Sequence, residues 1–352
     1  MNRRKFLAGA GAVAGLSAIG RSATSRTLPS QAQVIATIKS VNNYWIAHYK
    51  PGNNDWPEAT YFTGDLAAYD ATGQSNYLTH AESWANSWDY GLIDGPGTTY
   101  ANYQAAGQVY IRLFQLLQNS SALTQITDSI NGMVSSGIAD SWTWIDAINM
   151  SMPCFAQLGS IYDNPSYSPE MYRLYSYPKY TLGLYDTSRY LWWEDSTYAN
   201  TTTYWSRGNG WVFAAHAKLL AVITNQDANY QEYVSTFQNM AGALLAIQQS
   251  GGYWNPDLGG TDDQGPESSG TAFFMFGMAW GINAGLLNRA TYSPAIANAW
   301  SFFVNTAIQK SGFLGYVQPS GSAPATAPKN NTEDFGVGAF LLAAKQVAIL
   351  VG

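Results

Sequence analysis

The sequence repeats one local pattern: an apolar run of helical length, a short polar turn, a tyrosine, and a second helical run. The turns that show it lie at residues 73–77, 163–167, 227–230 and 289–292, with a weaker copy at 119–121. Their spacing is too uneven for an open stack of repeats, but it suits helical hairpins arranged in a closed ring. We therefore expect an all-α fold, an (α/α)6 barrel of six helical hairpins.

The two helices of each hairpin differ in composition. The second helices are rich in alanine and glycine, which allows the close packing that an inner ring needs, whereas the first helices carry more polar residues. The expected inner helices span residues 61–71, 104–118, 146–160, 209–223, 269–287 and 334–350. The expected outer helices span residues 33–48, 77–89, 122–135, 167–177, 230–248 and 294–308. No linker interrupts them, so residues 31–352 are expected to form a single domain.

The connections between helices fall into two classes. Turns from an inner helix to the next outer helix are short, whereas connections from outer to inner helices are long and hold most of the unusual residues. These long connections contain residues 55–58, 94–104, 140–146, 204–211, 254–271 and 312–335. Because helices alternate in direction around a ring, the long loops should meet at one end, around the N-termini of the inner helices, where helix dipoles favour anions. This end is the expected cleft for an acidic sugar.

The first residues have the features of an export signal. Arg3 and Arg4 precede a short apolar run, which indicates the twin-arginine route and a periplasmic or extracellular location. We assign residues 1–30 to this segment. The run is too short to span a membrane, and no later segment is expected to span one.

Charge and residue counts exclude several classes of function. The first 26 residues hold 5 of the 17 basic residues and none of the 23 acidic ones, so their removal lowers the net charge from −6 to −11. Such a protein repels nucleic acid and anionic lipid, and neither is an expected partner. Cys154 is the single cysteine, and His48, His80 and His216 lie far apart, so we expect no metal, no cofactor and no serine–histidine triad. The sequence leaves the oligomeric state open.

Residues 204–211 read Tyr-Trp-Ser-Arg-Gly-Asn-Gly-Trp and precede the helical run 212–223. Tryptophan rings can stack on a sugar, an arginine can hold a carboxylate through two parallel hydrogen bonds, and glycine lets the backbone come close. The combination suits the binding of an acidic sugar. The alternative is a packed aromatic turn with a capping arginine.

Several segments together resemble one family. They are Trp144–Ala147, Tyr204–Ala215, Pro266–Ala272, Gly277–Ile282 and Glu333–Gly338, in register with the hairpins from about Trp45 to the C-terminus. In this combination the chain resembles the unsaturated glucuronyl and rhamnogalacturonyl hydrolases, which are six-hairpin barrels. The resemblance implies a glycoside hydrolase that needs no cofactor and acts on oligosaccharides from polysaccharide lyases. Such enzymes hydrate the C4–C5 double bond of a terminal unsaturated uronic acid.

Asp146 is the residue that the resemblance assigns as proton donor. It follows Trp142-Thr143-Trp144, whose rings could exclude water from a carboxyl group and raise its pKa toward neutrality. The alternative is an aspartate that caps the N-terminus of a helix, which would lower the pKa instead.

The same resemblance gives a set of substrate-binding candidates. Arg207 would pair with the uronate carboxylate while Trp205 and Trp211 stack on the ring, and Asn209, unless it only forms the turn, would bind a hydroxyl group. Met150 lies one helical turn after Asp146 and could instead belong to the core. Glu267 and Asp334 are more typical of supporting or helix-start acids than of catalytic ones. The remaining candidates are Trp144, Asn102 and Gln104.

The chain also departs from the family's pattern. Asn102 and Tyr103 stand where an acidic residue precedes the segment matched by residues 104–108, and Glu194 stands where close relatives have a basic residue. We expect Glu194 at the rim, because a second acid beside a uronate would repel it. The departures leave two alternatives: a conventional inverting glycosidase that uses Asp146 with Glu267 or Asp334, and a catalytically silent sugar-binding protein.

Overall fold

The computed structural model describes residues 26–352. The export segment assigned to residues 1–30 therefore lies almost wholly outside the described part. Ser30, the last residue of that segment, already belongs to the domain. Its hydroxyl oxygen accepts from the Gln33 amide and so caps the first helix, and the Ser30 amide donates to the Gln33 side chain.

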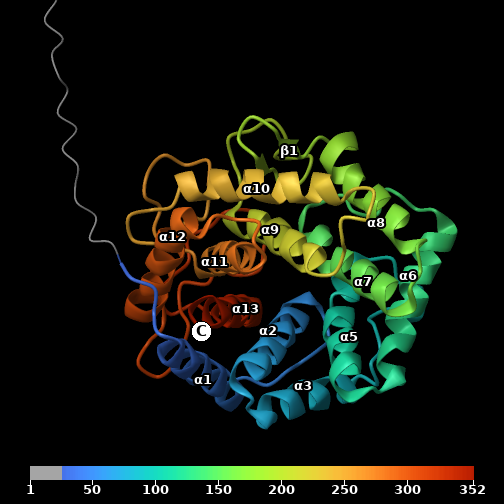
Figure 1. Ribbon diagram of the computed structural model, residues 1–352, viewed down its shortest axis with the longest axis horizontal. Coiled ribbons are helices and arrows are strands. Elements are labelled where there is room, and N and C mark those ends of the chain that lie inside the picture. Colours follow the sequence, from blue (N-terminus) through green and yellow to red (C-terminus); the bar gives the residue numbers. More distant parts are fainter. Residues whose placement is uncertain (1–25) are drawn as a thin grey trace, which may run out of the picture.

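Two concentric rings of helices form the molecule, as Figure 1 shows along the ring axis. The inner helices are α2 (Trp56–Thr72), α5 (Ala106–Leu117), α7 (Asp146–Tyr162), α9 (Ser206–Leu220), α11 (Ser268–Asn283) and α13 (Asp334–Val351). The outer helices are α1 (Gln31–His48), α3 (Ser75–Ser87), α6 (Thr124–Ser136), α8 (Tyr167–Ser176), α10 (Tyr230–Ala246) and α12 (Arg289–Phe302). The predicted all-α barrel of six hairpins is confirmed.

Helix boundaries differ from the expected ones where a cap moves the first turn. α2 begins at Trp56 rather than at residue 61, because Asp55 accepts a hydrogen bond from the Trp56 amide and Pro57 suits the first turn. α9 begins at Ser206 rather than at residue 209, which places Arg207 inside the helix rather than before it. The expected helix 104–118 is divided between a short α4 (Ala101–Gln104) and α5. Two π-helical turns, η3 (Tyr177–Thr181) and η4 (Phe303–Ala307), extend α8 and α12.

Close packing between the first and last inner helices closes the ring. A methyl group on Gly64 of α2 would lie 2.4 Å from the carbonyl oxygen of Gly338 in α13, and one on Gly338 would lie 2.3 Å from the carbonyl oxygen of Thr60. Only glycine permits this approach. The small residues that predicted the inner ring are thus the ones that let it close.

The last helix is more apolar than the sequence analysis allowed. By length and composition, α13 is long and apolar enough to cross a membrane. The sequence had led us to expect no such segment after the export signal. However, 72% of that window is buried inside the protein, and α13 packs against α2 and α11. Its composition fits a central helix of the barrel, which is surrounded by other helices on most sides.

A short two-stranded sheet interrupts the helices between α8 and α9. Strand β1 (Tyr185–Asp186) pairs antiparallel with β2 (Leu191–Trp192). The sequence pattern did not predict these strands. The chain that follows β2 leads directly to the site described next.

Candidate active site

The first turns of two inner helices bring together the main candidates. Asp146 is the first residue of α7 and Arg207 the second of α9, so both lie at the barrel end that carries the long loops. Their charges interact, since Arg207 opposes the rise in the pKa of Asp146. The expected placement of these two residues at one end is confirmed.

Asp146 has the properties of a proton donor. The position that would cap α7 belongs to Ile145, and Oδ1 of Asp146 is buried without a hydrogen-bond partner among residues 26–352. Burial raises its pKa to about 7, and the Arg207 charge only partly offsets this. The capping alternative would lower the pKa, so the structure favours the acid.

Glu194 lies beside Asp146, not at the rim. The segment after β2 pairs with the one before α7: the Ile145 amide donates to the Glu194 carbonyl oxygen at 3.0 Å, and Trp144 bridges to Asp195. Glu194 is only 3% exposed, and its Oε2 has no partner among the described residues. Burial, then the Asp146 charge, raises the pKa of Glu194 well above its usual range. The expectation of a rim position was wrong because it treated Glu194 as ionised, whereas a protonated acid does not repel a neighbour.

Gly208 makes room for the second acid. A methyl group on Gly208 would lie 2.4 Å from Oε2 of Glu194. The glycine that the sequence analysis associated with a sugar therefore admits a carboxyl group of the protein itself.

Arg207 is the cation of this cluster and is fully buried. Its guanidinium lies between two rings, 4.4 Å from the centroid of Trp205 and 4.6 Å from that of Phe335. Nη1 donates to the Gln318 carbonyl oxygen at 2.7 Å and Nη2 to that of Pro319 at 2.9 Å. Nε is buried and has no partner within the described residues. The protein thus occupies part of the fork that was expected to hold a uronate.

The residues around Arg207 have structural partners of their own. Trp205 is 1% exposed and donates from Nε1 to Gln318, and Trp211 is completely buried against Trp56 and Phe273. Neither has an open ring face for a sugar, so the stacking assigned to them was wrong for this conformation. Asn209 accepts from the Trp192 amide and donates to the carbonyl oxygens of Trp192 and Trp205. Both amide protons are used, and Asn209 anchors β2 instead of a hydroxyl group.

Three further candidates belong to the interior. Gln104 donates to Ser129 and accepts from Ser151, and Met150 is 1% exposed in α7. Glu267 caps α11 by accepting from the amides of Ser269 and Gly270. In this structure each of these side chains is buried in the interior, so none of the three offers an exposed group to a substrate. Glu267 also accepts from the Gln318 amide at 3.2 Å, which fixes the loop that holds Arg207.

A partly exposed aromatic group lies at the mouth of the site. The ring centroid of Trp144 lies 5.4 Å from that of Tyr100, and the ring centroid of Tyr100 lies 4.9 Å from that of Tyr103. Tyr100 is 45% exposed. Asn102 donates to the Tyr100 hydroxyl. Trp144 and Asn102 therefore remain accessible to a sugar. Trp144 lies two residues before Asp146 in the chain. Tyr100 was not foreseen, since a tyrosine in a loop carries no signal of exposure.

A second group of acids lies at the same end. Glu58, Glu333 and Asp334 line a cavity of about 170 Å³ together with Trp45 and Tyr49. Burial raises the pKa of Asp334 to about 7. Asp334 interacts with Glu58 and Glu333, whereas the acid that accompanies Asp146 is Glu194. The partners proposed for a two-carboxylate glycosidase, Glu267 and Asp334, are thus not the ones that the fold supplies.

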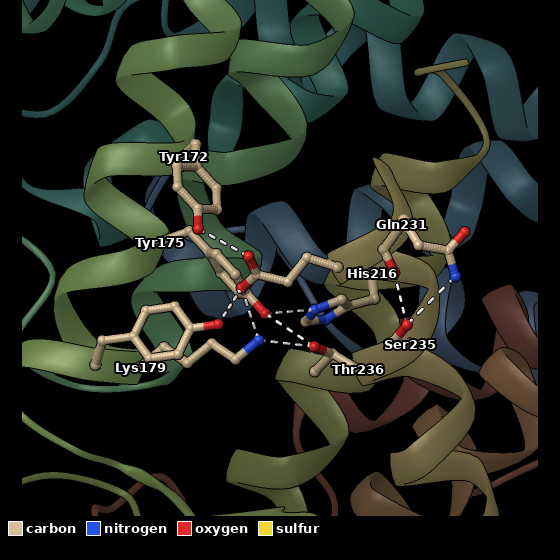
Figure 2. Close-up of polar contacts among 9 residues, drawn as sticks. Tyr172, Tyr175, Lys179, His216, Gln231, Ser235 and Thr236 are labelled. Atoms are coloured by element: carbon tan, nitrogen blue, oxygen red, sulfur yellow. Dashed lines mark hydrogen bonds and ion pairs between the residues drawn. The ribbon is translucent and has the colours of Figure 1, made fainter. Parts of the chain in front are cut away.

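A buried polar network supports the segment that delivers Glu194. In Figure 2, Lys179 lies between α8 and α10 and donates to Glu232 and Thr236, both at 2.8 Å. The Tyr172 hydroxyl also donates to Glu232, and Tyr175 contacts His216. Burial lowers the pKa of His216 to about 4, so it is neutral at pH 7. In the part of the chain from Arg26 onward no group of three His, Cys, Asp or Glu side chains could hold a metal ion.

Comparisons with known proteins show which family and fold this chain resembles. The sequence model of Glycosyl Hydrolase Family 88 matches residues 31–350. An unsaturated 3S-rhamnoglycuronyl hydrolase of Formosa agariphila is 30% identical over 326 residues, which cover 83% of this chain and 84% of that protein. The solved structure of a family 88 glycosyl hydrolase from Bacteroides vulgatus has a TM-score of 0.86 at 30% identity, covering 92% of this chain and 100% of that one. A solved structure described as a polysaccharide lyase has a TM-score of 0.85 at 32% identity, covering 91% and 97% of the two chains.

Proposed function

This chain belongs to Glycosyl Hydrolase Family 88 and is a glycoside hydrolase, and from that premise we propose that it removes a 4,5-unsaturated uronic acid from the end of oligosaccharides made by polysaccharide lyases. The family resemblance read from the motifs is confirmed. The observation that carries the proposal is the carboxyl group of Asp146: its Oδ1 is buried without a hydrogen-bond partner among residues 26–352, and its pKa of about 7 keeps a proton available near neutral pH.

The proposed reaction is hydration of the enol ether. Asp146 gives its proton to C4, so that positive charge develops at C5 and on the ring oxygen. Water adds at C5 and returns a proton to the Asp146 carboxylate. The resulting hemiketal opens and the remaining sugar leaves from C1. One carboxyl group thus acts first as acid and then as base.

Arg207 and Glu194 tune this acid. The buried Arg207 charge stabilises the Asp146 carboxylate after proton donation, and Glu194, when protonated, adds no opposing charge. The free Nε–H of Arg207 and the second proton on each terminal nitrogen are the donors left for a uronate carboxylate. Using them requires the substrate, or a movement of residues 318–319, to open the covered site.

A second function is favoured by one comparison, the similar structure described as a polysaccharide lyase. A lyase would remove the proton at C5 of a saturated uronate and break its C4–O4 glycosidic bond, so that the sugar attached at O4 leaves and the C4–C5 double bond forms that a hydrolase of the proposed kind consumes. Asp146 with an elevated pKa would then act as the base.

One assay separates these functions. The enzyme is incubated with unsaturated oligosaccharides, including rhamnose-containing ones because of the relative's name, and with their saturated counterparts, while the ultraviolet absorbance of the enol ether is followed. The proposed hydrolase lowers the absorbance of the unsaturated substrates. A rise with saturated substrates would support the lyase. If the absorbance changes with neither substrate, release of new reducing ends would support a conventional glycosidase, and its absence a silent sugar-binding protein.

We also propose that the enzyme is exported through its twin-arginine segment, for which Arg3 and Arg4 are the support. A reporter protein fused to residues 1–30 should leave the cytoplasm, and replacement of both arginines by lysine should retain it there. Export that persists after the replacement would contradict this route.

A further inference from the structure

A second cavity lies on the barrel axis at the end opposite Asp146. It has a volume of about 150 Å³ and is lined by residues of α2, α5, α7, α9 and α13. Most of its lining residues come from the middles or C-terminal halves of these helices, such as Lys218 in the last turn of α9, whereas Gln108 comes from the first turn of α5. The long loops of the active site are at the other end of the same helices.

Three cations converge on this cavity. Arg112, Lys218 and Lys345 line it, together with one acid, Asp70. Asp70 pairs with Arg112 at 2.7 Å and with Lys345 at 2.6 Å. A protein that has only 17 basic residues against 23 acidic ones therefore keeps two positive charges in excess in one small space.

Lys218 is the unusual member of the group. Its Nζ donates to Oε1 of Gln108 at 2.9 Å and to Oδ1 of Asn149 at 3.2 Å, and both acceptors are neutral. No carboxylate within residues 26–352 lies within ion-pair distance of it. Charges withdrawn from water are normally paired, so an isolated ammonium group with one free N–H at a cavity wall calls for an anion.

Helix dipoles explain only part of this charge. The negative ends of the inner helices lie at this end of the barrel and favour cations in the last turn. Arg112 and Lys345 lie more than one turn before the ends of α5 and α13. Lys218 does lie in a last turn, but it donates to side chains of α5 and α7 instead of to the free carbonyl groups of α9.

We propose that this axial cavity binds a small oxyanion, held by Lys218 and Arg112 with Lys345 at its entrance. The class includes inorganic sulfate, inorganic phosphate and the carboxylate of a free uronic acid. The cavity has room for such an ion with several waters, since one water takes up about 30 Å³ of liquid. Asp70 competes with the anion for Arg112 and Lys345. The site is independent of the reaction proposed for Asp146.

Protonation of Lys218 gives the site a pH dependence. Burial lowers the pKa of Lys218 to about 8. The charged or titratable groups that face it are Asp70, Arg112 and Lys345 across the cavity and Cys154 on α7, whose pKa burial raises to about 12. Binding should therefore weaken as the pH rises through about 8, and binding near that pH should take up protons from the buffer.

Calorimetric titration of the whole protein tests the proposal. Sulfate, phosphate and glucuronate are compared with chloride at equal ionic strength, which separates binding from the general stabilisation by sulfate and phosphate salts. We expect saturable binding of one oxyanion per chain, and the arm that binds best identifies the source. Absence of saturable binding in all three oxyanion arms would overturn the site.

Variants locate the binding. Lys218→Gln should lower the affinity about tenfold or more, as expected for the loss of a charged hydrogen bond. Arg112→Gln should also lower the affinity, and it changes a side chain that is 36% exposed, so the fold should tolerate it. Asp70→Asn should increase the affinity, because it removes the carboxylate that competes with the anion for Arg112. Lys310→Gln removes the same charge at an exposed position and should have no effect. Binding that is equal in wild type, Lys218→Gln and Arg112→Gln would show that the anion lies elsewhere and contradict the proposal.

Discussion

At the scale of single residues, the candidate active site brings together two acids and one cation, of which Glu194 and Arg207 are buried and Asp146 is half-buried. Asp146, Glu194 and Arg207 come from three different segments, and each lacks a hydrogen-bond partner for one side-chain atom among the described residues. Interacting acids release protons as a pair, so at least one proton is retained near neutral pH. This retained proton is what the proposed hydration of an enol ether would use.

Asp146→Asn should reduce turnover by about a hundred- to ten-thousand-fold, because the amide keeps the shape of the acid but has no proton to give. The absorbance assay measures the loss. Circular dichroism and substrate binding should remain close to those of the wild type. Near-normal turnover would remove Asp146 from the mechanism.

Glu194→Gln should leave the alkaline limb of kcat/KM nearly where it is in the wild type. That limb reports loss of the Asp146 proton, whose pKa is about 7, and Glu194 is still protonated there because its pKa lies well above its usual range. The substitution therefore replaces a neutral acid by a neutral amide. A limb that moves clearly to lower pH would show that Glu194 is ionised beside Asp146 and would contradict a protonated Glu194.

At the scale of elements, the position of Glu194 depends on a segment with little regular structure. Residues 177–195 pass through η3 and the two short strands before they reach α7. Asn209 holds this segment at β2, and the ion pair of Lys179 with Glu232 holds η3 against α10. Lys179 also lies 5.2 Å from the ring of Tyr185 in β1. The network in Figure 2 thus fixes the base of the segment that ends at the acid.

Glu232→Gln should cost about 3 kcal/mol of folding free energy at pH 7, the low end of the range for breaking a buried pair, because Lys179 stays buried without its partner. Burial alone would raise the pKa of Glu232, but hydrogen bonds from Lys179, Tyr180 and Tyr172 lower it overall. A folded-state pKa below the unfolded value stabilises the protein above that unfolded value, about 4.3, and the effect is lost as the pH falls through the folded pKa.

Urea unfolding at pH 7 and at acidic pH measures this effect. The difference between wild type and Glu232→Gln should shrink as the pH falls below about 4.3. Arg173→Gln, which breaks a pair with a half-exposed arginine on α8, should cost about 1 kcal/mol or less at pH 7. Equal losses in the two variants would contradict a special role for the buried pair.

At the scale of the whole molecule, the ring must close between helices whose contacting residues, Gly64 and Gly338, are 338 − 64 = 274 positions apart in the chain. α2 and α13 meet through Gly64 and Gly338, with backbone against backbone. This contact sets the distance between the first and last hairpins. It therefore also positions Asp334 relative to Glu58 at the loop end.

Gly338→Ala should destabilise the protein by about 1–3 kcal/mol, because the added methyl group overlaps the carbonyl group of Thr60 and pushes the two helices apart. Gly242→Ala is the matched control: it lies exposed in α10 with nothing within 4 Å of the added methyl group. It should stabilise the helix by up to about 1 kcal/mol. Thermal unfolding compares the two, and a loss of stability no greater in Gly338→Ala than in Gly242→Ala would contradict ring closure through this contact.

The sequence by itself determined the architecture. Helical runs, turns and the contrast between polar and Ala/Gly-rich helices are local properties, and they are enough to predict six hairpins and the end where their long loops meet. The motifs likewise determined the family, and they placed Asp146 at the start of its inner helix and Arg207 at the same end of the barrel, although Arg207 was expected to precede its helix rather than to lie in the first turn.

Only the tertiary structure decided which side chains remain available to a substrate. Trp205, Trp211, Asn209 and Gln104 have the right chemistry for sugar binding, but each is covered or hydrogen-bonded by segments distant in the sequence. Glu194 was misplaced for the same reason, since its burial and protonation depend on a strand pairing that no local pattern encodes. Exposure and pKa are set by what packs against a group from elsewhere in the chain, and they become known only when the chain has folded.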